Sequence, residues 1–402
     1  MNTSVSPPII IAGAGPVGLV LALRLGHWGI PCVVLESEPA INRDLRASTF
    51  HPPTLDMLDE YGITPGLIEQ GLVAPTWQVR MHATGEFAQF DVSVLKDETA
   101  HPYRLQCEQW RLSELLMAQI ARDLPHVQVL MNHPLVSFSQ AQGHVDVTYR
   151  TPAGEQVVVR GAFLVGADGG RSQVRKQLDL SFEGHTFPET TILATTHFPF
   201  HDHLPNLAYI NYCWSEQGTF SLLRLKHLWR VSLYPDEGQS MEEAVGMPAV
   251  REKLLRIAPG TLDHPVLEVR PYRIHQRVVQ KYVVGRVVLV GDAAHLNSPS
   301  GGMGMNGGIH DAFNLSEKLR DIWQGGSIDA LQRYERQRRP IAIAHVLEQS
   351  GRNRARMQER DMDKRRAALV ELQRKADDPA LHKAHLLNTS MITGLRESAA
   401  ID

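Results

Sequence analysis

The feature that most constrains this chain is a glycine-rich turn close to its start. Gly13, Gly15 and Gly18 follow the short apolar run Ile9–Ala12. That run predicts a buried strand, and the apolar spacing of residues 16–28 predicts a helix. In such a strand–turn–helix unit the first glycine permits the tight turn, the second lets the backbone approach a pyrophosphate, and the third allows close helix–strand packing. The start of the chain therefore predicts a dinucleotide-binding βαβ unit.

An acidic residue completes this pattern. Residues 31–36 predict the second strand of the unit, and it ends in Glu36. A carboxylate at that position accepts hydrogen bonds from both ribose hydroxyls and repels a 2′-phosphate. The site is therefore expected to favour FAD or NAD over NADP, and the fingerprint by itself leaves both open.

The composition excludes several classes of protein. The net charge of −3, from 41 basic and 44 acidic residues, argues against a nucleic-acid binder, which needs a basic surplus. Cys32, Cys107 and Cys213 lie far apart, so we expect neither a disulfide framework nor a zinc site, and no metal. The apolar stretch 9–35 is interrupted by glycine, proline and charge, so it predicts no membrane span. With no signal peptide apparent, a cytoplasmic location is expected.

Strand patterns of two kinds follow along the chain. Buried runs typical of an α/β domain return at Val283–Val290, followed by a glycine-rich loop and a helix predicted over 305–323. Between the two α/β parts, the runs 208–214, 219–225 and 228–234 alternate and are separated by polar turns, which indicates an antiparallel sheet.

Further segments complete the expected organisation. A helix is predicted to start near Leu105, and residues 127–131, 144–150 and 155–165 are expected to be strands. After Ile328 the chain is expected to be helical, and the highly charged stretch 351–374 is interpreted as a solvated helical face.

The expected fold class is α/β, α+β overall. It consists of a Rossmann-like FAD-binding domain, an inserted antiparallel β-sheet substrate domain and a helical C-terminus. We expect the FAD-binding domain to be discontinuous and to comprise residues 1–72, 107–181 and 276–350. The substrate domain is expected at 73–106 and 182–275, and the C-terminal helical segment at 351–402.

Two further motifs identify the family that the chain resembles. Val165–Ser172 carries Asp168-Gly169 at a strand-to-loop junction, and Gly285–His295 is an apolar run that ends in Gly291-Asp292. With the N-terminal fingerprint, these motifs resemble those of the single-component flavoprotein aromatic hydroxylases, the family of para-hydroxybenzoate hydroxylase. The resemblance covers about residues 9–347. Within the family, residues 271–277 and their surroundings are most similar to para-nitrophenol 4-monooxygenases.

The resemblance implies an activity and its partners. The chain would bind FAD non-covalently, take electrons from NADH or NADPH bound transiently, and use O₂ to hydroxylate a small, phenol-like aromatic substrate through a flavin C4a-hydroperoxide. No second dinucleotide fingerprint is expected in this family. A homodimer stays open.

The resemblance also assigns site residues. Asp168 would serve FAD and NAD(P)H, and Asp292, beside Gly291, would bind the ribityl hydroxyls. The loop before the predicted helix is rich in glycine, Gly304 included, so its N–H groups and the helix N-terminus can stabilise negative charge on a reduced flavin. By the same resemblance, Met305 and Asn306 would meet the flavin ring, and the carbonyl of Pro299 would line the reaction site. Arg46 and Gln109 would contact the phosphate or ribityl region of the flavin.

The expected substrate pocket lacks a cationic clamp. Relatives that bind hydroxybenzoate hold its carboxylate with an arginine and a serine on one strand, and the matching positions here are Leu223 and Leu225. Arg224 would then point to the other face, because strand side chains alternate. This register predicts an apolar pocket suited to phenols, heteroaromatics or larger apolar aromatics and not to benzoates, and a slip of one residue would change that prediction. The candidates to meet a substrate hydroxyl are Tyr209, Asn211, Tyr272 and His275.

Two other functions remain to be weighed. The same fold could serve an epoxidase or an oxygenase that modifies antibiotics or secondary metabolites. A flavin-binding protein without catalysis is the other class, and the intact cofactor motifs argue against it.

Overall fold

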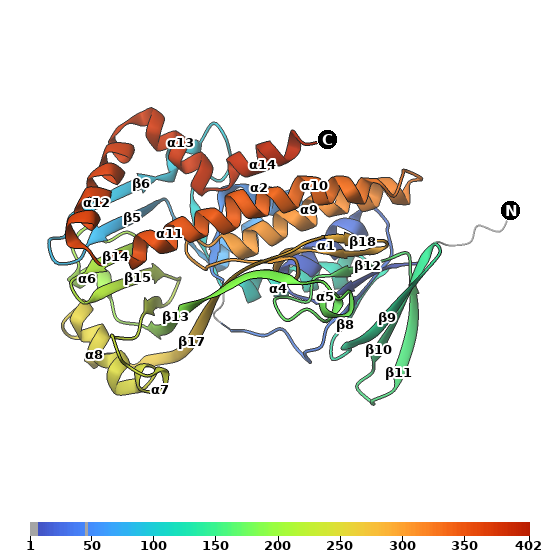
Figure 1. Ribbon diagram of the computed structural model, residues 1–402, viewed down its shortest axis with the longest axis horizontal. Coiled ribbons are helices and arrows are strands. Elements are labelled where there is room, and N and C mark those ends of the chain that lie inside the picture. The colour runs from blue at the N-terminus through green and yellow to red at the C-terminus, as the bar shows by residue number, and fades with distance from the viewer. Residues whose placement is uncertain (1–6, 45–46) are drawn as a thin grey trace.

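The computed structural model describes residues 7–44 and 47–402. Two large sheets lie side by side, and the two longest strands, β13 (Phe182–Thr196) and β17 (Val266–Val279), run from one part of the molecule toward the other (Figure 1). These strands pair with each other along most of their length. The mixed α/β architecture expected from the sequence is confirmed.

The first sheet has six strands in the order β18-β19-β12-β1-β2-β8. All pairs are parallel except the terminal hairpin β18–β19. Its strands are β1 (Ile9–Ala12), β2 (Cys32–Leu35), β8 (Val127–Leu130), β12 (Phe163–Gly166), β18 (Val283–Val284) and β19 (Val287–Leu289). The predicted βαβ unit is thus present, with β1 and β2 adjacent.

Three elements differ from the prediction, and one of them is the strand expected at 155–165, which is divided into β11 (Gln156–Gly161) and β12 of a different sheet. The single strand expected at Val283–Val290 is a hairpin, because Gly285 takes a left-handed φ of 61° and reverses the chain between β18 and β19. The helix expected from Leu105 begins later, since Leu105 lies in a strand, β7 (Arg104–Gln106), and α4 starts at Gln109. Pairing with two neighbouring strands outweighs the local helical pattern there.

The second sheet has eight strands in the order β20-β17-β13-β16-β15-β14-β5-β6. The predicted antiparallel meander is confirmed as β14, β15 and β16. β17 continues past the domain boundary expected between residues 275 and 276. The remaining strands of this sheet are β5 (Thr76–Met81), β6 (Phe87–Asp91), β14 (Ile210–Ser215), β15 (Gly218–Arg224), β16 (Trp229–Leu233) and β20 (His295–Leu296).

Two small sheets of three strands complete the strand content of the described residues. One is the antiparallel meander β11-β10-β9, and the other has the order β3-β7-β4. Their strands, beside β7, are β3 (Thr49–Phe50), β4 (Leu72–Ala74), β9 (Leu135–Ala141), β10 (His144–Arg150) and β11 (Gln156–Gly161).

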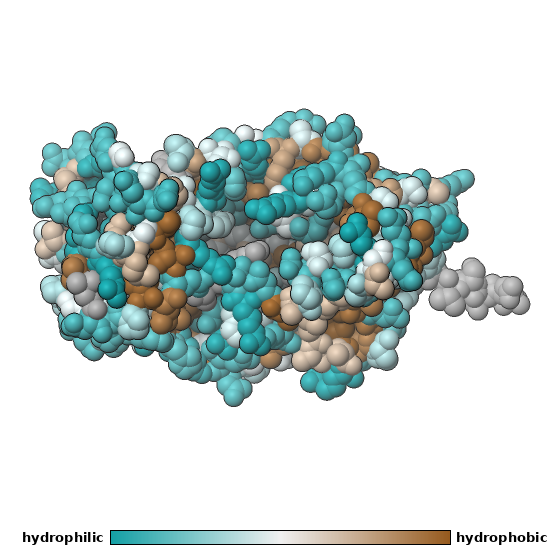
Figure 2. Space-filling view, turned by 90° about the horizontal axis from the view of Figure 1, so that it is seen from below, coloured by the Kyte–Doolittle hydropathy of each residue, from teal (hydrophilic) through white to brown (hydrophobic). Residues whose placement is uncertain are grey.

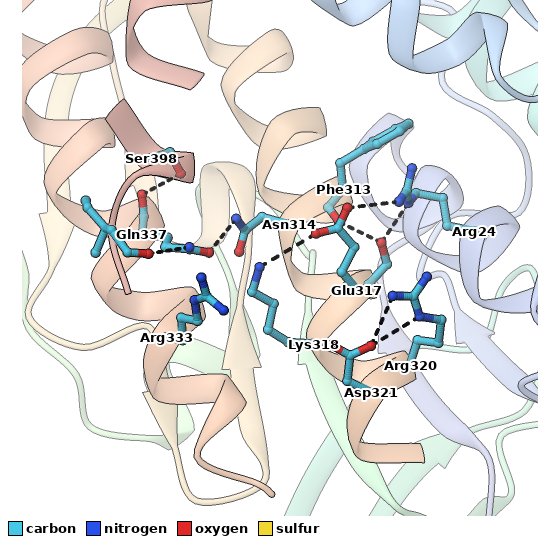
Figure 3. A network of polar contacts seen from close by, with 12 residues as sticks. Arg24, Phe313, Asn314, Glu317, Lys318, Arg320, Asp321, Arg333, Gln337 and Ser398 are labelled. Carbon is cyan, nitrogen blue, oxygen red and sulfur yellow. Dashed lines mark hydrogen bonds and ion pairs between the residues drawn. The ribbon is translucent and has the colours of Figure 1, made fainter. Parts of the chain in front are cut away.

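Helix α9 (Met303–Trp323) joins several parts of the molecule. On one side Arg24 of α1 donates from Nε to Ser316 Oγ at 2.7 Å and stacks over the Phe313 ring (Figure 3). On the other side Asn314 donates to Gln337 Oε1 at 2.9 Å. The other helices are α1 (Pro16–His27), α2 (Pro52–Asp59), α3 (Thr64–Gln70), α4 (Gln109–Asp123), α5 (Gln173–Gln177), α6 (Phe200–His203), α7 (Met241–Ala244), α8 (Met247–Ile257), α10 (Ala330–Ile341), α11 (Glu348–Gln358), α12 (Met362–Asp377), α13 (Pro379–Thr389) and α14 (Ile392–Ala399), with 3-10 or π turns at η1 (Val92–Leu95), η2 (Thr261–Asp263), η3 (Gly291–Ala293) and η4 (Ala342–Leu347).

The C-terminal helices cover one end of the second sheet (Figure 1). Leu369, Leu372 and Leu386 are buried in one cluster with Trp77 and Phe90 of the sheet. The interpretation of 351–374 as a solvated face is therefore wrong for its buried side, because the sheet supplies an apolar surface that only tertiary packing brings to these helices.

The outer surface is mainly hydrophilic. Figure 2 shows hydrophobic side chains gathered in separate patches on both halves of the face that it presents. Within 7–44 and 47–402, none of the helices combines the length and the apolar character that crossing a membrane requires.

Candidate active site

The glycine turn has the geometry of a phosphate cradle. A Cβ on Gly13 (φ 104°) would meet Ala167 O at 2.5 Å, and one on Gly18 would meet Gly13 O at 2.0 Å. A Cβ on Gly15 would find nothing within 4 Å, so the space beside this residue is open. The first and third glycines therefore serve packing, and the second faces room for a ligand at the N-terminus of α1.

Glu36 is held in place at the end of β2. Its Oε2 accepts the N–H of Ala14 at 2.7 Å, and its Oε1 accepts the N–H of Glu38 at 2.9 Å. The carboxylate is thereby tied to the glycine turn itself, which is the position expected of a ribose ligand.

Asp168 follows β12 next to the cradle. Its Oδ2 accepts the N–H groups of Gln173 at 2.7 Å and Val174 at 3.1 Å. Its Oδ1 is buried and has no hydrogen-bond partner among the described residues. A buried carboxylate oxygen without a donor is costly, so this atom fits a ligand that supplies one.

Asp292 follows β19 and is exposed, and it comes after Gly291, whose φ of 57° turns the chain. The turn is fixed from behind by Asp311 of α9, whose Oδ2 accepts the N–H of Gly291 at 3.1 Å. His295 Nε2 lies 2.7 Å from the same oxygen, and Arg338 Nε donates to Oδ1 at 2.7 Å.

This buried cluster keeps Asp311 charged. Burial alone would raise the pKa of Asp311, but Arg338 and His295 outweigh it and hold the pKa down at about 2. The side chain of Asp311 is fully buried, so the pairs are screened little. Sequence reasoning missed this support, since nothing in the local pattern of α9 or α10 marks Asp311 and Arg338 as partners.

The glycine-rich loop leads into α9. Gly301 (φ 98°) and Gly302 (φ 70°) are left-handed, and Gly302 N donates to Pro299 O at 3.0 Å. Pro299 is exposed, and Met305 is 9% exposed. A Cβ on Gly304 would meet Asn297 Oδ1 at 2.8 Å.

The side chain of Asn306 is occupied by the protein itself. Its Oδ1 accepts the N–H of His51 at 3.0 Å, and its Nδ2 donates to Thr49 O at 2.8 Å and Gly302 O at 2.6 Å. These bonds tie the loop to the 49–51 segment. The side chain of Asn306 therefore positions the start of α9, and only its backbone remains for a direct contact with a ligand.

The other two expected flavin ligands have different outcomes. Gln109 is the first residue of α4, is half-buried, and its N–H donates to Ala47 O at 3.0 Å. Arg46 lies outside the described residues.

The three motifs meet at one edge of the first sheet. β1, β12 and β19 are neighbours and parallel, and the glycine turn, Asp168 and Asp292 follow their carboxyl ends. The Gly13 Cβ position lies 3.1 Å from Asp168 Cα, and that of Gly291 lies 3.2 Å from Val17 of α1. Ligands of open α/β sheets bind at this carboxyl edge. The fit to an extended dinucleotide such as FAD therefore rests on geometry as well as on motif.

The surroundings of Leu223 are less apolar than its own strand predicts. Leu223 pairs across the sheet with Arg230 of β16, so both side chains lie on one face of the sheet. Arg230 is only 9% exposed and donates from NH1 to Ser48 Oγ at 3.2 Å. Leu225 is fully buried in the turn between β15 and β16. The neighbouring strand thus brings a cation to a face that the single-strand pattern predicts to be apolar.

Asn211 and Tyr209 are not placed as substrate ligands. Asn211 Nδ2 donates to Ala208 O at 2.6 Å, and its Oδ1 accepts the N–H of Ala208 at 3.1 Å, so this fully buried amide stabilises its own strand end. Tyr209 is 41% exposed at the surface. Because side chains alternate along β14, Tyr212 and not Asn211 faces the cavity described below.

His275 and Tyr272 lie on β17 with odd spacing, so they point to opposite faces of the sheet. His275 Nδ1 is 2.8 Å from Thr186 Oγ1. Burial, with Arg277 and Arg273, lowers the pKa of His275. Tyr272 is 40% exposed. The roles of the two residues toward a substrate hydroxyl stay predictions, since the pairing of β13 with β17 shifts register between Thr186 and Thr190, opposite this part of β17.

A cavity lies where the second sheet, the glycine-rich loop and the C-terminal helices meet. The space between its walls, counted together with the open solvent at its mouth, is about 440 Å³. The lining residues are Trp77, Val79, Arg104, Tyr212, Ser300, Gly301, Met303, Asn353, Arg356, Met357 and Thr389. A larger hollow, of about 650 Å³, has no residue of the glycine-rich loop in its wall, so we assign it no part in the chemistry.

Sequence reasoning missed the polar lining of this cavity. The alternation of β14 offers a signal for Tyr212, since the adjacent Cys213 belongs to the core on the helix-packed face. No local signal marks Arg104 or Arg356, because they come from β7 and α11, far from the meander in sequence.

Comparisons with known proteins agree with this geometry. The model of the family described as FAD binding domain matches residues 6–349. The chain is 33% identical over 393 residues to the para-nitrophenol 4-monooxygenase of Pseudomonas sp. (strain WBC-3), covering 96% of each chain. It is 34% identical over 358 residues to the 6-hydroxy-3-succinoylpyridine 3-monooxygenase HspB of Pseudomonas putida, covering 87% of this chain and 88% of that one.

A solved structure extends the likeness to the fold. The crystal structure of p-nitrophenol 4-monooxygenase PnpA from Pseudomonas putida DLL-E4 superposes with a TM-score of 0.90 at 30% identity. The superposition covers 97% of this chain and 98% of that one.

Proposed function

The chain belongs to the FAD binding domain family, within the FAD-dependent aromatic hydroxylases, and we propose that it hydroxylates a small phenol-like aromatic with NADH or NADPH as the reductant. It is a flavoprotein monooxygenase that acts on aromatic substrates. The similar enzymes named for nitrophenol and for a hydroxypyridine support a single hydroxylated ring as the substrate.

One observation carries the proposal. The cavity beside the second sheet is lined by Ser300 and Gly301 of the glycine-rich loop and by Met303, the first residue of α9. The same loop lies beside the carboxyl edge where the three cofactor motifs meet. A flavin ring held at that edge and an aromatic ring in the cavity would therefore share one wall.

The residues of the chain have distinct tasks in this proposal. Glu36 binds the adenosine ribose, Asp292 binds the ribityl hydroxyls, and the N-terminus of α9 stabilises negative charge on the reduced ring. Bound and reduced, FAD supplies the activation of O₂. Apolar side chains of the cavity, Trp77 and Met303 among them, exclude water from the reacting atoms.

The first test is cofactor content. The purified protein should be yellow, and its denatured supernatant should contain FAD and not FMN, because Glu36 recognises a ribose that FMN lacks. A colourless protein that takes up no added FAD would overturn the proposal.

The second test is turnover. A panel of phenols, nitrophenols, aminophenols, hydroxypyridines and benzoates should include compounds that stimulate oxidation of NADH or NADPH. With ¹⁸O₂, one labelled oxygen should appear in a ring hydroxyl of the product. Stimulated oxidation that yields an epoxide, or a product without label, would assign the enzyme to another reaction of the same fold.

A further inference from the structure

The cavity holds two guanidinium groups from distant parts of the chain. Arg104 comes from β7 and Arg356 from α11, and both line the cavity. Arg104 is 3% exposed, and its guanidinium lies 5.0 Å from the centre of the Trp77 ring. The Tyr212 side chain, which lines the same cavity, interacts favourably with the charge of Arg104.

No acidic side chain balances these cations. The lining contains no aspartate or glutamate. Arg104 Nε is buried without a hydrogen-bond partner among the described residues, and within residues 7–44 and 47–402 neither Arg104 nor Arg356 forms an ion pair with a carboxylate. Burying unpaired cations is costly, so a site that keeps them is suited to an anion from outside the protein.

Two neighbouring histidines add no positive charge to the cavity. Burial lowers the pKa of His385 to about 3, and the charges of Arg356 and Arg104 add to that effect. Burial also lowers the pKa of His51, again with Arg104 contributing. Both imidazoles are therefore neutral at pH 7, and the guanidinium groups are the permanent charges of the cavity.

We propose that Arg104, Arg356 and Tyr212 form an anion-binding subsite, and that the aromatic substrate carries a carboxylate held there while its ring lies against the 300–303 loop. This inference rests on the proposed function and narrows the substrate class to hydroxylated aromatic carboxylates. Guanidinium groups match the planar carboxylate with paired hydrogen bonds, and the Tyr212 hydroxyl adds a third polar contact. This substrate class is the opposite of the uncharged aromatics that Leu223 and Leu225 predict.

The test measures ligand binding to the FAD-loaded enzyme. Binding is monitored by the change that it causes in the flavin absorbance, so no turnover is needed. The probes are matched pairs that differ only in charge, para-hydroxybenzoate with para-hydroxybenzamide and 4-hydroxyphenylacetate with its amide. In the unaltered enzyme at least one carboxylate should bind about tenfold or more tightly than its amide.

Variants assign that preference to the subsite. Arg356→Gln should weaken carboxylate binding by about ten- to a hundredfold and leave amide binding nearly unchanged. Its fold should survive, because the bond from Trp214 Nε1 goes to the backbone carbonyl of Arg356. Arg356→Lys should keep part of the preference, and Arg352→Gln, at an exposed site one turn earlier on α11, should keep all of it.

The outcomes separate the subsite from the activity. Equal binding of acid and amide in every pair, or an equal loss of both in Arg356→Gln, overturns the subsite. If uncharged phenols are hydroxylated while carboxylates are not preferred, the activity stands and the subsite is wrong. If carboxylates bind as expected while no aromatic stimulates NAD(P)H oxidation, the subsite stands and the proposed activity is wrong.

Discussion

Two aspartates near the end of β19 have different roles because one is exposed and the other is fully buried. Asp292 is exposed on the turn that follows the strand. The carboxylate of Asp311 is hydrogen-bonded inside the protein to Gly291, His295 and Arg338. The exposed Asp292 is accessible to a cofactor, whereas Asp311 fixes the backbone that presents it. The distinction depends on burial, which neither residue type nor spacing reveals.

Replacing Asp292 should weaken cofactor retention. Asp292→Ala removes charge-assisted hydrogen bonds worth roughly 1.5–3 kcal/mol each, so the Kd for FAD should rise about ten- to more than a hundredfold. FAD titration of the apoprotein measures this, with the exposed Asp377→Ala on α12 as the control. An unchanged Kd would show that Asp292 has no part in FAD binding.

His310 should make stability depend on acid pH. Burial, with the charge of Arg338, lowers its pKa from 6.5 to about 3 in the folded protein. The unfolded chain therefore binds one more proton between about pH 6.5 and 3, so stability is complete above this window and is lost as the pH falls through it. Within the window, one such proton contributes a slope of about 1.4 kcal/mol per pH unit.

Urea unfolding at a series of pH values measures that slope. His310→Gln keeps a polar partner near Thr54, whose hydroxyl lies 3.0 Å from His310 Nε2, and removes the titration. The variant should lose less stability than the parent between pH 6.5 and 4. Parallel curves for the two proteins would refute a buried neutral His310.

At the scale of elements, the position of α1 depends on the glycines at and before its start. The chain turns at Gly13, and Gly18 lets α1 approach the strand so closely that no other residue fits there. Gly15 has an ordinary extended backbone, with φ −71° and ψ 176°, and open space beside it. The three glycines of the motif are therefore needed for different reasons, Gly13 and Gly18 for the turn and the packing of α1, and Gly15 for the open space beside it.

Alanine substitutions should separate the contribution of Gly15 to FAD binding from the contribution of Gly18 to folding. Gly15→Ala should fold with unchanged thermal stability in the apoprotein and bind FAD weakly, because its methyl group enters the space of the pyrophosphate. Gly18→Ala should destabilise the apoprotein itself, because its methyl group would lie 2.0 Å from Gly13 O. Thermal unfolding and FAD titration of both variants test this, and similar behaviour of the two would contradict it.

At the scale of the whole molecule, the C-terminal helices complete the second sheet. Leu386 of α13 and Leu372 of α12 are buried against strands from the first quarter of the chain. α11 brings Arg356 to the cavity, and Ser398 of α14 donates to Gln337 O of α10 at 2.9 Å. The cavity thus exists only when the last segment has packed onto the sheet.

Truncating one side chain in this contact should show how much the contact contributes to the free energy of unfolding. Leu386→Ala should lower the free energy of unfolding by about 2–5 kcal/mol, the usual cost of a cavity in a core. Val370→Ala, at a side chain that is 64% exposed, should change it little. Chemical denaturation measures both, and an equal, small effect of the two would show that α12 and α13 are not integral to the core.

The parts that the sequence determined by itself are those with a local cause. The βαβ unit needs glycine at positions where a Cβ cannot fit, and the meander of β14 to β16 follows from alternation and turn residues. The order of the three motifs along the chain implies that they meet, since parallel strands present their carboxyl ends on one edge. Family, cofactor and the general reaction follow from these local signals.

Only the tertiary structure decided what surrounds the substrate cavity. Arg230 reaches the face of Leu223 through strand pairing, and Arg104, Tyr212 and Arg356 converge from a short strand, the meander and a C-terminal helix. The buried side of α12 differs from the prediction for the same reason. A local pattern records the preference of one segment, whereas the charge and burial of a cavity are sums over segments that only folding brings together.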